Sequence, residues 1–114
     1  MNRYSSITTK YNDHKSKLYF SRIELNRILE FYSFGVSKGN WKDYAIQFNN
    51  NEAYFHFFKN SSEKPMISIS KKKLNKKSKY SFYLLKTNNQ LFSHDNIDNL
   101  LVYLNRNNIR LISK

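Results

Sequence analysis

Cysteine is missing from the 114-residue chain, and proline and glycine are scarce, with one proline and two glycines. Without cysteine the chain has no disulfide framework, thiol nucleophile or cysteine-ligated metal. Two glycines are too few for a glycine-rich phosphate-binding loop. No segment approaches the roughly 18 apolar residues of a membrane span, and the opening residues lack an apolar run of signal-peptide length. These absences predict a soluble, cytoplasmic protein without membrane contact.

Acidic residues are also scarce. The 8 acidic residues stand against 20 Lys and Arg, so the formal net charge is +12. Lys outnumbers Arg 15 to 5 and there are 16 Asn, and AT-rich codons specify both Lys and Asn. Codon bias is therefore one interpretation of the basicity. The other is functional, because a charge of this size attracts polyanions such as RNA or DNA.

The length indicates one domain, expected over residues 18–114. Residues 1–17 are polar and without periodicity, which predicts a mobile tail. Ser21 and Glu24 have the spacing of a capping box. The helix that follows carries apolar residues at a 3-4 spacing and is expected to end at Gly39, which suits the left-handed position after a helix.

Five strands and a second helix follow in the pattern. Strands are expected at about 41–48, 53–59, 66–70 and 80–86 and around Leu91 and Phe92, with a tight polar turn from Asn49 to Glu52 between the first two. Ser93 or Asp95 is expected to cap the second helix, and residues 108–114 fit either a last strand or a tail. The short links predict an α+β two-layer sandwich: a four- to five-stranded antiparallel meander with an N-terminal and a C-terminal helix on one face.

The face that the helices leave open is unusually aromatic. Residue parity along the strands assigns to it Trp41, Tyr54, His56, Phe58 and Tyr83. Three interpretations stay open: an interface with a partner protein or a second copy, a platform on which nucleic-acid bases stack, or simple burial by the ends of the chain.

Lysine is concentrated in a nine-residue segment that has no acid. It contains Lys71, Lys72, Lys73, Lys76, Lys77 and Lys79. One interpretation is a polyanion-binding loop that positions phosphates without reading bases. The other is a solvated loop in a lysine-rich chain.

Neither a catalytic nor a metal-binding constellation is apparent. The three histidines are isolated, and no spacing of Ser, His and acid suggests a triad. His94, Asp95 and Asp98 nominally offer metal ligands, but acids at a helix N-terminus are explained by the helix dipole. We therefore expect no enzymatic activity, no cofactor and no metal.

Two segments resemble a known family. The matching positions of the first are Phe20, Glu24, Leu25, Asn26, Gly39, Trp41, Asp43, Tyr44, Ala45 and Ile46; those of the second are Ser62, Glu63, Pro65, Leu74 and Tyr80. The run from Leu18 to about Leu104 is similar to an uncharacterised alphaproteobacterial family, domain of unknown function 2794. The resemblance implies a bacterial cytoplasmic protein and no mechanism. Relatives are basic in the lysine-rich segment through arginine, which favours a functional origin of the charge there.

The function expected from these observations is non-enzymatic binding. The first hypothesis is contact with nucleic acid or another polyanion through the lysine-rich loop beside the aromatic face. The alternative is a protein-protein interaction or homodimerisation module that uses the same face.

Overall fold

The computed structural model describes residues 17–60, 64–74, 79–87 and 89–107. The predicted tail, except for Lys17, and the undecided segment 108–114 lie outside the described residues. The elements are α2 (Arg22–Ser37), β1 (Asp43–Phe48), β2 (Glu52–Phe58), β3 (Ile67–Leu74), β4 (Lys79–Lys86), β5 (Asn89–His94) and α3 (Ile97–Arg106). No helix in the described part of the chain is long and apolar enough to cross a membrane.

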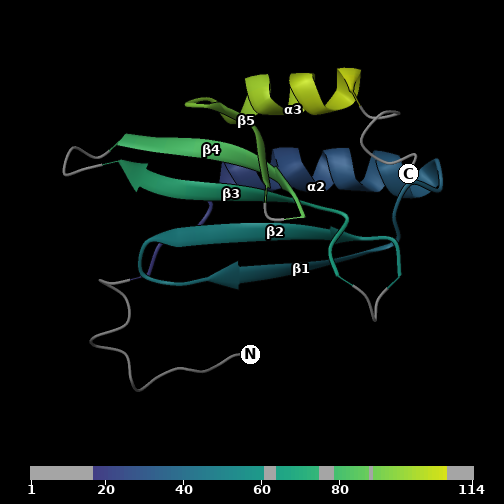
Figure 1. The fold of residues 1–114 in the computed structure, drawn as a ribbon, viewed down its shortest axis with the longest axis horizontal. Helices are drawn as coiled ribbons and strands as arrows, with labels where there is room; N and C mark the ends of the chain where they lie inside the picture. The colour runs from purple at the N-terminus through teal and green to yellow at the C-terminus, as the bar shows by residue number, and fades with distance from the viewer. Residues whose placement is uncertain (1–16, 61–63, 75–78, 88, 108–114) are drawn as a thin grey trace.

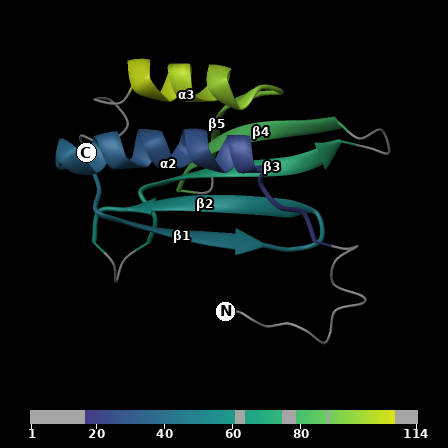
Figure 2. The same ribbon diagram turned by 180° about the vertical axis from the view of Figure 1, so that it is seen from behind.

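The five strands form one antiparallel sheet in the order β1-β2-β3-β4-β5, so the predicted α+β meander is confirmed. The helix α2 lies behind the sheet in Figure 1 and in front of it in Figure 2, and α3 runs beside α2 at the β5 edge. Rows of apolar residues cross the sheet beneath the helices: Ile46, Phe55, Ile69, Leu84 and Phe92 are successive register partners. The core therefore lies between this face and the two helices.

Local sequence signals explain how α2 begins and ends. Glu24 N–H donates to Ser21 Oγ (3.1 Å), while Ser21 N–H donates to Glu24 Oε1 (2.7 Å), which confirms the capping box. At the other end Gly39 has a φ of 80° and donates to Val36 O, and Asn40 donates to Gly35 O. This pair of bonds is a Schellman motif, so the expected role of Gly39 is confirmed.

Asparagine organises two of the connections. Asn49 Oδ1 accepts from the N–H groups of Asn51 (3.0 Å) and Glu52 (2.9 Å), which closes the predicted β1-β2 turn. At α3 the N-cap is Asn96, whose Oδ1 accepts from Asp98 N–H at 2.7 Å. The expected caps Ser93 and Asp95 are therefore wrong: β5 continues through Ser93 to His94, and the helix begins only at Ile97.

Trp41 belongs to the core, and its predicted place on the open face is wrong. Its side chain is 2% exposed, and its Nε1–H donates to the carbonyl oxygen of Tyr32 at 2.9 Å. Strand parity misplaces it because β1 begins only at Asp43, after Trp41 has turned toward α2. The indole lies against Gly35, where a Cβ atom would come within 2.3 Å of the ring. The indole fits against α2 because Gly35 has no side chain.

Candidate binding cleft on the open sheet face

The sheet face opposite the helices carries the candidate site. Small side chains on β3, Ser68 and Ser70, lie between larger ones on β2 and β4, because Tyr54 and Tyr83 flank Ser70 in the register. A cleft of about 690 Å³ opens here, lined by Gln47, Asn49, Glu52, Tyr54, His56, Lys64, Pro65, Ile67, Ser68, Lys72, Leu85 and Thr87. Its lining comes from four strands, β1 to β4, and from the residues that lead into β3.

Hydrogen bonds to side chains on both adjoining strands, β1 and β3, fix His56 in the cleft. Its Nδ1 lies 2.6 Å from Ser68 Oγ and its Nε2 lies 3.0 Å from Gln47 Oε1. Burial lowers the pKa of His56, which favours the neutral ring. In the neutral form Nε2–H donates to Gln47 and Nδ1 accepts from the Ser68 hydroxyl, so both ring nitrogens are satisfied.

A second network lies at the β1-β2 turn end of the cleft. The Tyr54 hydroxyl donates to Glu52 Oε1 at 2.7 Å, and Lys72 Nζ lies 3.4 Å from Glu52 Oε2. The Tyr54 hydrogen bond, reinforced by Lys72, lowers the pKa of Glu52. Burial and the adjacent Glu52 raise the pKa of Tyr54. Lys72 also lies over the ring of Tyr83, 5.1 Å from its centroid.

The rings of the face are brought together as predicted, apart from Trp41. Tyr54 and His56 stack with centroids 5.4 Å apart and an interplanar angle of 10°. His56 and Phe58 meet edge to face at 6.4 Å. Tyr83 stands across Ser70 from Tyr54. Three of these rings therefore follow one another along β2, and Tyr83 stands apart from them on β4.

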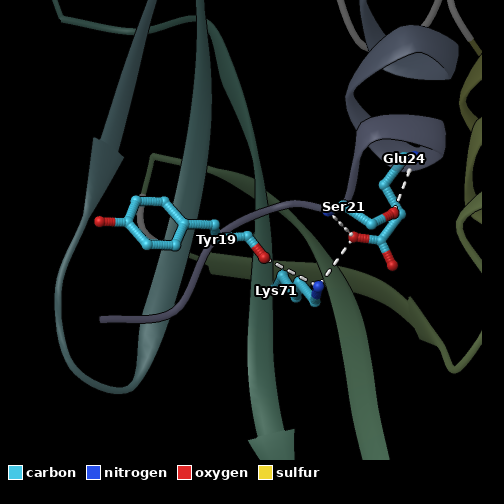
Figure 3. A network of polar contacts seen from close by, with 4 residues as sticks. All are labelled: Tyr19, Ser21, Glu24 and Lys71. Carbon is cyan, nitrogen blue, oxygen red and sulfur yellow. Dashed lines mark hydrogen bonds and ion pairs between the residues drawn. The ribbon is translucent and has the colours of Figure 1, made fainter. Parts of the chain in front are cut away.

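Lys71, expected in a polyanion-binding loop, has a different position. It lies on β3, is 4% exposed, and points to the helix side of the sheet. Figure 3 shows its Nζ donating to the carbonyl oxygen of Tyr19 (2.9 Å) and to Glu24 Oε1 (2.8 Å). It also lies over the ring of Tyr80 at 4.5 Å. The placement of Lys71 in an exposed loop is wrong, because strand pairing continues past Ser70 and turns its side chain to the core.

The other predicted lysines divide between the two sheet faces. Lys72 and Lys73 also belong to β3, and Lys79 begins β4, so strands replace most of the expected loop. Register pairs Lys72 with Ser81 and Lys79 with Leu74, which places Lys72 and Lys79 on the open face, whereas Lys73 alternates to the helix side. Lys76 and Lys77 lie outside the described residues.

The cleft places one histidine beside one hydroxyl group. His56 and Ser68 resemble a base and a nucleophile, but Ser68 lies in a strand paired on both sides, with His56 and with Leu85. Backbone N–H groups committed to the ladder are not free to stabilise an oxyanion. Among the described residues no group of three His, Cys, Asp or Glu side chains could hold a metal ion. His94, which the sequence offered as a nominal metal ligand, has its Nδ1 3.0 Å from Asp95 Oδ1, and the same nitrogen accepts from Asn96 N–H.

A family of proteins matches most of the chain. The family described as protein of unknown function (DUF2794) matches residues 18–99, well over half of the chain. The chain belongs to this family. Searches of curated proteins and of solved structures found no match.

The positions of sharpest resemblance to the family have structural roles. Gly39 closes the Schellman motif, Trp41 fills the space at Gly35, and Asp43 Oδ1 accepts from Tyr44 N–H at 2.8 Å. This part of the family pattern therefore specifies how α2 joins β1 rather than a ligand site.

Several cleft residues were missing from the predicted site. Gln47 and Ser68 share the parity of His56, so the alternation of the strands could have identified them. Lys64 and Pro65 precede β3, and no local signal brings them to the cleft.

Proposed function

We propose that this protein is a non-enzymatic, cytoplasmic binding protein whose open sheet face contacts single-stranded nucleic acid. The observation that carries the proposal is the cleft itself: Tyr54, His56 and Tyr83 stand on a sheet face that the described helices leave uncovered, and Lys64 and Lys72 line the same cleft. Aromatic rings on a sheet can stack with bases of any sequence, and adjacent cations follow the phosphate backbone.

The charge of the chain supports an anionic ligand. The net charge is +12, and Lys79 joins Lys64 and Lys72 on or beside the open face. Lys71 takes no part because Glu24 neutralises it within the fold. If three lysines contact phosphates, log affinity for a single strand should fall with log salt at a slope of about −2.

The test is fluorescence anisotropy with labelled single-stranded DNA and RNA across a salt series. The variant changes Lys64, Lys72 and Lys79 to Gln, and a matched control changes Arg22, Lys38 and Arg106 to Gln. The control removes the same charge from exposed positions in or at the ends of the helices. We expect the cleft variant to lose affinity and most of the salt slope, and the control to keep most of both. If both variants lose the same affinity, binding depends only on the net charge of the chain, and the cleft is not the site.

A second candidate is a protein contact, with a partner or with a second copy, through the same face. Two observations favour it: Tyr54 and His56 stack on each other, so each already uses one ring face, and Glu52 partly neutralises Lys72. Aromatic side chains are also enriched in protein interfaces. Sedimentation that shows a dimer disrupted by Tyr83→Ala, together with no binding of either oligonucleotide, would support this second function.

A further inference from the structure

A separate apolar groove runs between the two helices, on the outer side of the helix layer. It has a volume of about 450 Å³ and is lined by Arg27, Glu30, Phe31, Phe34, Asp98, Leu101, Val102 and Asn105. Phe34 is 54% exposed and Val102 is 49% exposed. Clustered exposed apolar residues with a polar rim are typical of a protein-docking surface.

The spacing of the lining residues indicates the shape of the occupant. On α2 they fall at 27, 30, 31 and 34, and on α3 at 98, 101, 102 and 105. Each set is an i, i+3, i+4, i+7 stripe, the stripe by which one helix packs against another. The inner stripes of these helices, which include Ile28 and Leu100, are buried in the core. Because α2 and α3 lie side by side in both views (Figures 1 and 2), their outer stripes form a seat for a third helix.

The distribution of acids indicates the charge of the occupant. Among the six acids in the described residues, Glu24 and Glu52 pair with lysines, Asp98 pairs with Arg27, Asp43 accepts from the backbone, and Asp95 lies 3.0 Å from His94. The remaining acid, Glu30, lines the groove together with Asp98.

The cations at the groove are already engaged. Arg27 Nε lies 3.7 Å from Asp98 Oδ1, and Lys38 lies over the Phe34 ring at 4.8 Å. Glu30 has no ion pair among the described residues, so an occupant with a cation beside its apolar stripe would complement the rim.

We propose that the groove between α2 and α3 binds an amphipathic helix of a partner protein that carries Lys or Arg beside its apolar stripe. A second copy of this chain is the alternative occupant, and the oligomeric state of the free chain tests it. Nucleic acid is a poorer occupant, because the groove is apolar and holds two of the chain's few acids. The groove and the cleft lie on opposite sides of the sheet, so the partner helix and the ligand of the cleft can bind together.

The experiment selects binders to the full chain from a displayed library of helical peptides. Each peptide has apolar residues at i, i+3, i+4 and i+7 and random residues beside them. We expect Lys or Arg to be enriched in the random positions. The best peptide should bind the Val102→Asp variant at least about tenfold more weakly. Val36→Asp is the matched control, since Val36 is 40% exposed on α2 and lies outside the groove, and it should leave affinity unchanged.

A charge reversal tests the rim directly. Glu30→Lys should weaken the selected basic peptide about two- to fivefold or more, and selection on that variant should enrich acidic residues instead. Circular dichroism confirms that each variant is folded. Any of three results would overturn the proposal: no enrichment over selection on Val102→Asp, equal loss in the Val36→Asp control, or a dimer of the free chain that Val102→Asp dissociates.

Discussion

Lys71 and Glu24 meet across the interior although 47 positions separate them, with Nζ 2.8 Å from Oε1. The same carboxylate oxygen accepts from Ser21 N–H, so one glutamate caps α2 and neutralises a buried lysine (Figure 3). The pair joins the N-terminus of the helix to the central strand of the sheet. It also explains why a lysine in the most basic segment of the chain is not available to a ligand.

Lys71→Met should lower the free energy of unfolding by about 2–3 kcal/mol, because removing one partner leaves the Glu24 carboxylate without its counter-ion. Chemical denaturation measures the change. Lys73→Met is the control, since Lys73 is exposed two residues along the same strand, and it should change stability by less than about 0.5 kcal/mol. In a Glu24→Gln background the Lys71 substitution should cost less. Equal costs in the two backgrounds would contradict direct coupling of the pair.

Gly35→Ala should destabilise the protein by about 1–3 kcal/mol, because its Cβ would lie 2.3 Å from the Trp41 ring. Alanine otherwise favours a helix interior, so the sign of the effect separates packing from helix propensity. Thermal or chemical denaturation provides the measurement. In a Trp41→Leu background, where the indole is absent, Gly35→Ala should become neutral or stabilising. If Gly35→Ala destabilises the Trp41→Leu protein just as much, the strain does not come from the indole.

The features visible in the sequence are those set by near neighbours along the chain. The capping box, Gly39 and the Asn49 turn depend on contacts within a few residues. Alternation along β2 placed Tyr54 and His56 on the open face because a strand holds that period throughout its length.

The predictions that failed depended on contacts that the sequence pattern does not contain. Trp41 lies before β1, so the alternation of side chains along that strand does not apply to it. Lys71 looks like its neighbours in composition, and only the fold brings Glu24 beside it. The cleft residue Lys64 is likewise placed by the path of the chain into β3.

His56 should make stability depend on pH. Its pKa in the folded protein lies below the ordinary value of 6.5 because burial disfavours the charged ring. As pH falls, the unfolded chain binds the proton first, so the contribution of His56 is fully present above about pH 6.5 and is lost as pH falls through the folded-state pKa. Denaturation curves of the wild type and of His56→Gln across this range give the difference, which cancels the carboxylates common to both. A difference that stays constant with pH would contradict a half-buried ring that is held neutral in the fold.

The contributions of ring stacking and of charge to the binding of single-stranded DNA should be separable by their salt dependence. Tyr83→Leu keeps an apolar side chain but removes a ring, so affinity should fall by about fivefold or more at every salt concentration, with the salt slope unchanged. Lys72→Gln should instead reduce the slope by about 0.7, the share of one phosphate contact. Phe34→Leu is the matched control, because it removes an exposed ring from the helix layer on the other side of the sheet. Anisotropy titrations at several salt concentrations measure both quantities. Equal losses for Tyr83→Leu and Phe34→Leu would show that the ring on the open face has no special part in binding.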